Sequence, residues 1–281
     1  MKVVNTLTDL RAARVDLPEP FGLVPTMGFL HEGHLSLVRR AKQECSSVGV
    51  SIYVNPTQFA PTEDLEAYPR DLERDLALLE GEGTDLVWTP DNNQLYPPGA
   101  QTWVTVDELT QTLEGARRPG HFRGVTTIVT KLFNAFQPQR AYFGQKDAQQ
   151  ARVIQRMVQD LLIPCEIIVC PIVRETDGLA MSSRNTYLAG PERLTATVLS
   201  RALQEAQSVF DAGERNADAL RETMRRVLDS EPLAKPQYVS VADPETLFEL
   251  EGEIDEALLS MAVYVGKTRL IDNLVLVNSE K

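Results

Sequence analysis

Short apolar runs alternate with helix-like patterns through the first two-thirds of the chain. Five of these runs are rich in β-branched or aromatic residues and have the length of buried strands, namely 21–25, 48–54, 85–88, 141–143 and 165–170. Between them, apolar residues recur every three or four positions, most clearly in 125–136 and 153–162, which predicts amphipathic helices. Strands that alternate with helices indicate βαβ units, so we expect an α/β fold with a doubly wound, parallel, Rossmann-like sheet.

The pattern changes after about residue 175. Helix-like patterns and then strand-like runs follow at 191–210, 217–228, 237–241, 260–265 and 269–277. A short turn at Gly266 and Lys267 joins the last two runs, as in an antiparallel hairpin. We therefore expect a Rossmann-like domain over 1–175 and a second, smaller α+β domain over 176–281.

Composition and charge narrow the class of protein. The 281 residues include 28 Lys and Arg against 40 Asp and Glu, a formal net charge of −12. Broad nucleic-acid binding needs a basic face, so we expect no nucleic-acid partner. No apolar run approaches the roughly 18 residues of a membrane span, and the N-terminal residues lack a signal peptide's apolar stretch. The three scattered cysteines indicate no disulfide framework, so we expect a cytoplasmic protein without a membrane partner.

The segment 25–34 carries the motif Pro-Thr-Met-Gly-Phe-Leu-His-Glu-Gly-His between the first expected strand and its helix. Doubly wound folds bind ligands at such junctions, and a helix N-terminus favours phosphate. His31 and His34 share one face there and can donate hydrogen bonds to phosphoryl oxygens, while Gly28 and Gly33 let a nucleotide approach the backbone. A spacing of three excludes the zincin motif, whose histidines are four apart. The alternative is a pair of surface histidines at a helix cap.

The segment after the second expected strand suits a small polar substrate. Asn55 and Gln58 follow the second expected strand and can bind hydroxyl groups or a carboxylate, although Asn-Pro is also an ordinary turn. Arg70, in the Tyr-Pro-Arg sequence that follows, supplies a cation or is simply solvated.

The segment 117–124, Arg-Arg-Pro-Gly-His-Phe-Arg-Gly, gathers positive and titratable groups at the start of a helix. Its His, Pro and Gly residues favour a functional role over a solvated charge run.

Two later segments are candidates for phosphate binding. In 144–150, Gly-Gln-Lys-Asp-Ala-Gln-Gln, Asp147 and Gln150 fit an N-cap and a residue that reaches back to it. Lys146 faces the positive end of the helix dipole, which is unfavourable without an anion, so Lys146 is the stronger functional candidate. The segment 174–185 contains Met-Ser-Ser-Arg and either closes over phosphates as a mobile lid or is a linker.

These segments all fall at strand-to-helix junctions or at the expected domain boundary. They offer His, Lys, Arg, Gln and Ser, without a Cys-His pair or a Ser-His-Asp order. Such side chains suit phosphoryl or nucleotidyl transfer, in which positioning and charge neutralisation supply most of the catalysis. From the residues alone we infer an ATP-using transferase or ligase with a small polar co-substrate.

The same segments resemble, in order and over nearly the whole chain, the pantothenate synthetase (pantoate–β-alanine ligase) family. The histidine-glycine and Met-Ser-Ser-Arg motifs mark only the wider HIGH-motif nucleotidyltransferase superfamily, which includes class I aminoacyl-tRNA synthetases. The Asn-Pro-Thr-Gln-Phe, Tyr-Pro-Arg and Gly-Gln-Lys-Asp sequences make the resemblance more specific, with Gln145 standing where many members have Glu. The resemblance implies that ATP and pantoate form pantoyl adenylate and pyrophosphate, and that β-alanine then displaces AMP to give pantothenate for coenzyme A synthesis.

The resemblance also implies roles for individual residues and domains. The expected ATP contacts are Met27, Gly28, His31, His34, Gly144, Lys146, Asp147, Met181, Ser182, Ser183 and Arg184. The catalytic residues among them are expected to be His31, His34, Lys146 and Arg184. The residues expected to bind pantoate are Gln58, Gln150 and Asn55. Mg²⁺ would bind mainly to the ATP phosphates, with Asp75 as an outer contact. The domain 176–281 would cover the active site. A homodimer is expected.

Two alternatives stay open at this point. One is another adenylating enzyme of the superfamily with a different acid substrate, and the other is a non-catalytic nucleotide-binding protein. Gln58 and Gln150 favour pantoate, because a neutral amide can bind a carboxylate and hydroxyl groups together. The presence of both histidines, Lys146 and Arg184 argues against a non-catalytic protein.

Overall fold

The computed structural model describes residues 1–60 and 63–278, which form two compact units. The first unit comprises Met1–Gln111, Gly115–Gln145 and Gln150–Pro171. The second unit comprises Thr112–Glu114, Lys146–Gln149 and Ile172–Lys281. The main division lies a few residues before the boundary expected at 175, and two short internal segments group with the second unit.

The first unit is built on a parallel six-stranded sheet in the order β1-β4-β3-β2-β5-β6. The strands are β1 (Lys2–Val4), β2 (Phe21–Thr26), β3 (Ser47–Ile52), β4 (Leu86–Trp88), β5 (Arg140–Gly144) and β6 (Glu166–Cys170). Starting from β2, the chain adds strands first on one side and then on the other, so the strand order reverses between β2 and β5. The parallel α/β fold expected from the sequence is therefore confirmed.

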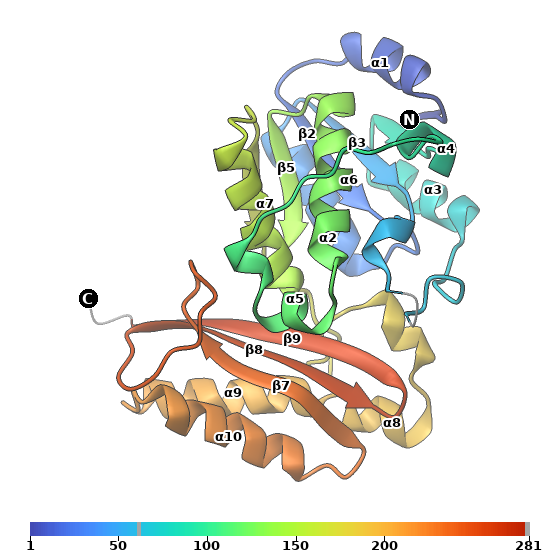
Figure 1. Ribbon diagram of the computed structural model, residues 1–281. Helices are drawn as coiled ribbons and strands as arrows, with labels where there is room; N and C mark the ends of the chain where they lie inside the picture. The colour runs from blue at the N-terminus through green and yellow to red at the C-terminus, as the bar shows by residue number, and fades with distance from the viewer. Residues whose placement is uncertain (61–62, 279–281) are drawn as a thin grey trace. The chain divides into compact units, whose positions relative to one another are not determined.

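Helices connect these strands along the chain (Figure 1). They are α1 (Leu7–Val15), α2 (Glu32–Glu44), α3 (Leu72–Gly81), α4 (Asn92–Leu95), α5 (Leu113–Arg117), α6 (His121–Phe136) and α7 (Ala148–Asp160). Three short 3₁₀ turns lie among them: η1 (Pro56–Gln58), η2 (Glu108–Thr110) and η3 (Gln145–Asp147). In the described ranges, no helix is both long and apolar enough to cross a membrane.

Both faces of the parallel sheet are covered by helices. Adjacent residues of a strand point to opposite faces, and Phe21 and Gly22 illustrate this on β2. The Phe21 ring stacks on Phe136 of α6, with 6.1 Å between the ring centroids. A Cβ on Gly22 would instead lie 3.4 Å from the Cβ of Ala41 in α2, so this glycine lets α2 approach the other face. The strands are buried on both faces, which explains why they read as continuous apolar runs.

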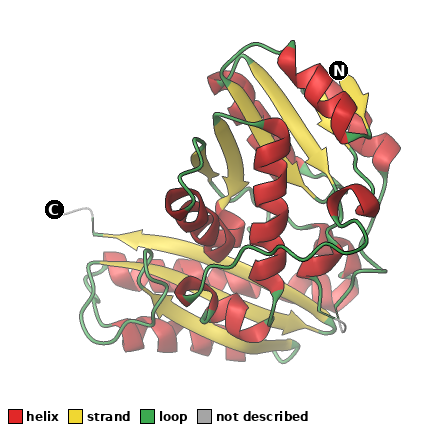
Figure 2. Cartoon of the chain, turned by 45° about the horizontal axis from the view of Figure 1, so that its top comes forward, coloured by secondary structure: helices red, strands yellow, loops and turns green. Residues whose placement is uncertain are grey.

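The second unit contains an antiparallel sheet in the order β7-β8-β9, packed with helices (Figures 1 and 2). Its elements are η4 (Ser183–Tyr187), α8 (Gly190–Thr195), α9 (Val198–Asp211), α10 (Ala217–Asp229), β7 (Ala234–Ala242), β8 (Glu256–Val265) and β9 (Thr268–Val277). Leu203 and Phe210 of α9 share an apolar core with Met261 of β8. The single helix expected over 191–210 is two helices, and Thr197 Oγ1 donates to the Leu194 carbonyl at the break.

Candidate active site

The switch in strand order brings two of the expected motifs to one edge of the first unit's sheet. Ligands of open α/β sheets bind beyond the carboxyl ends of the strands, at the point where the strand order reverses. That point lies between β2 and β5. Met27 directly follows β2, and Gly144 is the last residue of β5. The fold therefore places the histidine-glycine motif at the position where ligand binding is most expected.

His31 and His34 form a capping box at the start of α2. His31 is the N-cap, and its Nδ1 accepts a hydrogen bond of 3.2 Å from the Gly33 backbone N–H. The Nδ1 of His34 accepts one of 3.3 Å from the His31 backbone N–H. Because Nδ1 accepts in both rings, each neutral imidazole carries its proton on Nε2. The cap and a catalytic role are therefore compatible, since capping uses Nδ1 and a phosphoryl oxygen would use Nε2–H.

A buried carboxylate holds the turn that precedes the histidines. Asp75 is 1% exposed, and its two oxygens accept 2.7 Å hydrogen bonds from the backbone N–H groups of Phe29 and Leu30. Gly28 and Phe29 have positive φ angles of 81° and 49°, so the turn needs this support. Burial raises the pKa of Asp75, and the two N–H groups oppose that effect. The carboxylate thus positions the loop before His31, and the expected outer contact of Asp75 with magnesium stays a prediction.

Asn55 and Gln58 are buried and contact each other. The Asn55 amide donates a hydrogen bond of 3.0 Å to Gln58 Oε1 and one of 3.2 Å to the Gly124 carbonyl. Its Oδ1 accepts a 2.9 Å hydrogen bond from the Thr57 hydroxyl, so this side chain organises η1 as well as an Asn-Pro turn. Gln58 Nε2 lies 3.1 Å from Met27 Sδ. The structure therefore brings a residue expected to bind pantoate into contact with one expected to bind ATP.

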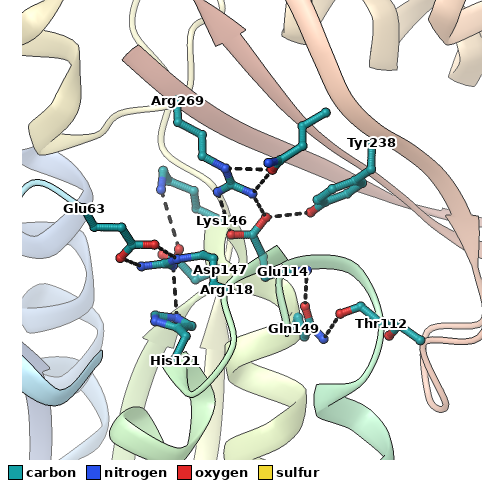
Figure 3. A network of polar contacts seen from close by, with 11 residues as sticks. Glu63, Thr112, Glu114, Arg118, His121, Lys146, Asp147, Gln149, Tyr238 and Arg269 are labelled. Carbon is teal, nitrogen blue, oxygen red and sulfur yellow. Dashed lines mark hydrogen bonds and ion pairs between the residues drawn. The ribbon is translucent and has the colours of Figure 1, made fainter. Parts of the chain in front are cut away.

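The basic segment 117–124 is anchored to the same loop and is not a solvated charge run. Arg118 forms a two-pronged ion pair with Glu63, with distances of 2.6 and 2.8 Å (Figure 3). Its Nη1 also lies 3.1 Å from Nε2 of His121. Nδ1 of His121 lies 2.8 Å from the Gln58 backbone carbonyl. The third histidine of the chain thus holds the backbone of Gln58 in place, a role that its sequence position did not reveal.

Two of the other expected cations, Arg123 and Arg70, have local partners. Arg123 stacks on Trp103, with its guanidinium carbon 4.3 Å from the ring centroid. Arg70 donates to backbone carbonyls, among them that of Tyr68 at 3.2 Å, and so closes its own loop. Arg117 is exposed at the end of α5. Arg118 is linked to Gln58 through His121.

Lys146 and Asp147 belong to the second unit, in η3 directly before α7. Lys146 Nζ lies 3.6 Å from Asp147 Oδ1, and 21% of the Lys146 side chain is exposed. Asp147 directly precedes Ala148, the first residue of α7, which is the position expected of an N-cap. Gln150 lies in α7 and belongs to the first unit.

A network around Gln149 was missed by the sequence analysis. Gln149 is buried. Its side chain accepts a hydrogen bond of 2.9 Å from the Glu114 backbone N–H and donates one of 3.0 Å to the Thr112 carbonyl (Figure 3). The Glu114 carboxylate binds the Arg269 guanidinium at 2.7 and 2.8 Å. It also accepts a hydrogen bond of 3.0 Å from the Tyr238 hydroxyl. This network explains why the segment of Thr112–Glu114 groups with the second unit. The only signal in the sequence was a second glutamine beside Gln150.

The segment 174–185 begins with a closed hairpin over 174–180 in the second unit. Arg174 and Ala180 pair as an antiparallel bridge. Arg193 binds Glu175 at 2.6 Å and Asp177 at 2.7 Å, and its hydrogen bond with Asp177 holds the pKa of that carboxyl below its usual value. The first part of the segment is therefore an organised hairpin and not a structureless linker.

The Met-Ser-Ser-Arg motif directly follows this hairpin and begins η4. Ser182 is the N-cap of η4, and its hydroxyl accepts 3.3 Å from the Arg184 backbone N–H. Ser183 is buried, whereas Met181 is half-buried. Arg184 is held at a defined place by this turn, as a role in phosphate binding requires.

No protein cage for a metal is seen among the described residues, since they contain no group of three or more His, Cys, Asp or Glu placed to hold one ion. The free cysteines Cys45, Cys165 and Cys170 are all buried. Metal-assisted chemistry on bound phosphates does not need such a cage, because Mg²⁺ keeps several waters and binds through substrate phosphates.

A parallel doubly wound sheet with a histidine-capped helix at its switch point defines a nucleotide-binding α/β protein. The family model described as pantoate-beta-alanine ligase matches residues 2–275, and the chain belongs to this family. It is therefore an ATP-dependent ligase by family, as the sequence analysis expected.

Curated relatives agree with this assignment. The pantothenate synthetase of Roseiflexus sp. (strain RS-1) is 62% identical over 276 residues, which cover 98% of this chain and 99% of the relative. That of Herpetosiphon aurantiacus is 57% identical over 278 residues, with 98% and 100% coverage.

Solved structures agree as well. Pantothenate synthetase from Thermus thermophilus has a TM-score of 0.93 and 47% identity, covering 98% of this chain and 99% of that one. The pantoate-β-alanine ligase of Francisella tularensis, complexed with beta-gamma ATP and β-alanine, has a TM-score of 0.81 and 34% identity, with 98% and 97% coverage. These likenesses confirm the fold class expected from the sequence.

Proposed function

We propose that this chain condenses pantoate with β-alanine to form pantothenate, using ATP, through a pantoyl adenylate, with release of pyrophosphate and AMP. Family membership supports the reaction class, and the relative complexed with beta-gamma ATP and β-alanine supports the substrates. The observation that carries the proposal is the pair of His31 and His34, which cap α2 through Nδ1 and therefore have Nε2–H donors. As the pantoate carboxylate attacks the α-phosphorus, negative charge grows on oxygens that such donors stabilise.

In this proposal the ATP contacts are Met27, Gly28, His31, His34, Gly144, Lys146, Asp147, Met181, Ser182, Ser183 and Arg184. Pantoate is bound by Gln58, Gln150 and Asn55. The buried contact between Asn55 and Gln58 supports the last assignment, because a preorganised amide pair loses little freedom when it binds a hydroxyl group.

Mg²⁺ is proposed to enter with ATP, with Asp75 as an outer contact. When bound, the ion neutralises phosphate charge and orients the leaving pyrophosphate. Lys146 and Arg184 then bind phosphate oxygens from the protein side. The two hydrogen bonds that Asp75 already accepts from backbone N–H groups leave it suited only to an outer, water-mediated contact.

The reaction is proposed to divide into two stages. The cysteines are buried, and no Ser-His-Asp order is present, so no acyl-enzyme is expected. AMP itself must then activate the pantoate carboxylate. With ATP, Mg²⁺ and pantoate alone, the enzyme should release about one pyrophosphate per active site and exchange labelled pyrophosphate into ATP.

The same assay tests the proposed function. Addition of β-alanine should yield AMP and pantothenate in equal amounts, and Arg184→Ala should slow the pyrophosphate exchange. Strict dependence of pyrophosphate release on β-alanine would contradict the two-stage scheme. Exchange supported by other hydroxy acids but not by pantoate would indicate an adenylating enzyme with a different acid substrate.

We further propose that the protein acts in the cytoplasm as a homodimer. The described cysteines are free thiols, as expected in a reducing compartment. The dimer rests on the resemblance to the family. Light scattering of the purified protein tests it, and a monomer mass at assay concentration would contradict it.

A further inference from the structure

Asp272 and Asn273 are neighbours on β9 and are both buried, although their side chains are polar. Asp272 is 2% exposed and Asn273 is 3% exposed. Buried polar side chains are costly unless they are hydrogen-bonded, so their partners show what they are for. Both sets of partners lead to segments that the proposed function assigns to ATP.

Asn273 holds the segment of Lys146. Its Nδ2 donates a 2.9 Å hydrogen bond to the Lys146 backbone carbonyl. Lys146 lies in the short turn η3, which has little internal structure to fix its place. The bond therefore determines where the lysine side chain begins, and thus what its ammonium group can reach.

Asp272 holds the hairpin that leads to Arg184. Its two oxygens bind Arg174 Nη1 at 2.7 Å and Nη2 at 3.0 Å. Arg174 Nη1 also donates a hydrogen bond of 3.0 Å to the Gly178 carbonyl, across the hairpin that precedes Ser182. Gly178 has φ +93°, and a Cβ there would lie 2.9 Å from Ser200 Oγ, so the hairpin has little freedom to shift.

The two anchors are joined to each other. The Asn273 backbone N–H donates 2.8 Å to Asp272 Oδ1. Burial raises the pKa of Asp272, while the hydrogen bond and charge of Arg174, the Asn273 backbone N–H and the charge of Lys146 oppose that effect. A buried ion pair of this kind is seldom more stabilising than apolar residues of similar size. Its presence is better explained by the geometry that it imposes on Lys146 and Arg174.

We propose that Asp272 and Asn273 are positioning residues for adenylate formation, which set the separation between Lys146 and the segment 182–184. This inference rests on the proposed function and deepens it. Neither residue needs to touch ATP. Asn273 acts through the Lys146 backbone carbonyl, and Asp272 acts through the Arg174 guanidinium, which holds the hairpin before Ser182. A misplacement of about 1 Å can lower a rate about 10²-fold, so such anchors affect catalysis strongly.

The first test replaces Asn273 by Ala and Asp272 by Asn. Pantoate-dependent exchange of pyrophosphate into ATP should fall about 10- to 100-fold in each variant. The KM for pantoate and the rate at which supplied pantoyl adenylate reacts with β-alanine should change less than twofold. Equal losses in both stages, or unchanged exchange, would overturn the proposal.

The matched control is Leu270→Ala on the same strand. Leu270 is 4% exposed in the core of the second unit, and its truncation lowers stability without touching either anchor. Below its unfolding temperature this variant should keep the wild-type ratio of the two stages. If it shows the same selective loss of exchange as Asn273→Ala, the effect is one of stability and positioning is disproved.

A double-mutant cycle gives the decisive comparison. If Asn273 acts through Lys146, adding Asn273→Ala to Lys146→Ala should lower the exchange rate less than twofold further. Independent, multiplicative losses would contradict the assignment. A wild-type protein without pantoate-dependent exchange would instead contradict the proposed function itself, so the two failures are distinguishable.

Discussion

The Nδ1 atom of His121 lies 2.8 Å from the backbone carbonyl oxygen of Gln58. A carbonyl only accepts hydrogen bonds, so this nitrogen carries a proton. Arg118 Nη1, which only donates, lies 3.1 Å from Nε2 on the other side of the ring. His121 is therefore a neutral imidazole in one tautomer, and it connects the Arg118–Glu63 ion pair to the backbone of Gln58.

His121→Ala should weaken pantoate binding. Loss of a buried hydrogen bond, which leaves the Gln58 carbonyl unsatisfied, costs about 1–3 kcal/mol. We expect the KM for pantoate to rise about tenfold, with the KM for ATP little changed, in steady-state assays. His121→Asn should recover part of the loss, because its amide can donate from nearly the place of Nδ1. The control is Arg117→Ala, an exposed residue of the same segment, and an equal effect there would contradict the role of His121.

Substitutions of His34 should separate the cap from catalysis. His34→Ala loses both, so the helix should be less stable by about 0.5–2 kcal/mol. Turnover should fall about 10²–10³-fold if the Nε2–H donor stabilises the transition state. His34→Glu should restore the thermal midpoint, since Glu at this helix position completes a capping box, but not the turnover. Recovered turnover in His34→Glu would mean that the histidine only caps the helix.

Much of the fold could be predicted from the apolar pattern. The strands of a parallel sheet are buried on both faces, so they read as apolar runs, and α6 and α7 have clear amphipathic periodicity. The pattern missed β1, which is three residues long and exposes Val3. Such a strand is defined by its pairing with β4, far along the chain, and not by its own composition.

The site could be predicted only as far as residue chemistry at strand ends allows. His31, Gln58 and Lys146 stand out because their types and positions suit phosphate or carboxylate binding. The supporting contacts could not be found in this way, because they join distant parts of the chain. Asp75 is 45 residues from Leu30, and Asn273 is 127 residues from Lys146. Only the folded chain shows that these polar residues hold functional loops.

Alkaline conditions should destabilise the protein partly through Cys165. Burial raises the pKa of this thiol from 9.0 to about 12. Between these values the folded protein keeps a proton that the unfolded chain loses, so this contribution to stability is lost as the pH rises. The urea midpoint should therefore fall from pH 9 to pH 11, and less steeply in Cys165→Ala. Val153→Ala, a buried substitution without a titratable group, should lower the midpoint but keep the wild-type slope.

Gly124 should be required for the position of Gln58. A Cβ at this residue of α6 would lie 2.5 Å from the Thr57 carbonyl oxygen and 2.7 Å from the Gln58 backbone nitrogen. Both atoms are backbone, so Gly124→Ala must push η1 away from α6. We expect the KM for pantoate to rise at least tenfold, together with a loss of stability of about 1–3 kcal/mol from overpacking.

The matched control for that variant is Gly81→Ala at the end of α3. A Cβ there meets nothing within 4 Å, and alanine is the better helix former by about 0.8–1.0 kcal/mol. Gly81→Ala should therefore have wild-type kinetics and a midpoint equal to or above that of the wild type. Steady-state assays with varied pantoate, and urea unfolding of both variants, make the comparison. Wild-type pantoate kinetics in a folded Gly124→Ala protein would show that the contact between α6 and η1 does not position Gln58.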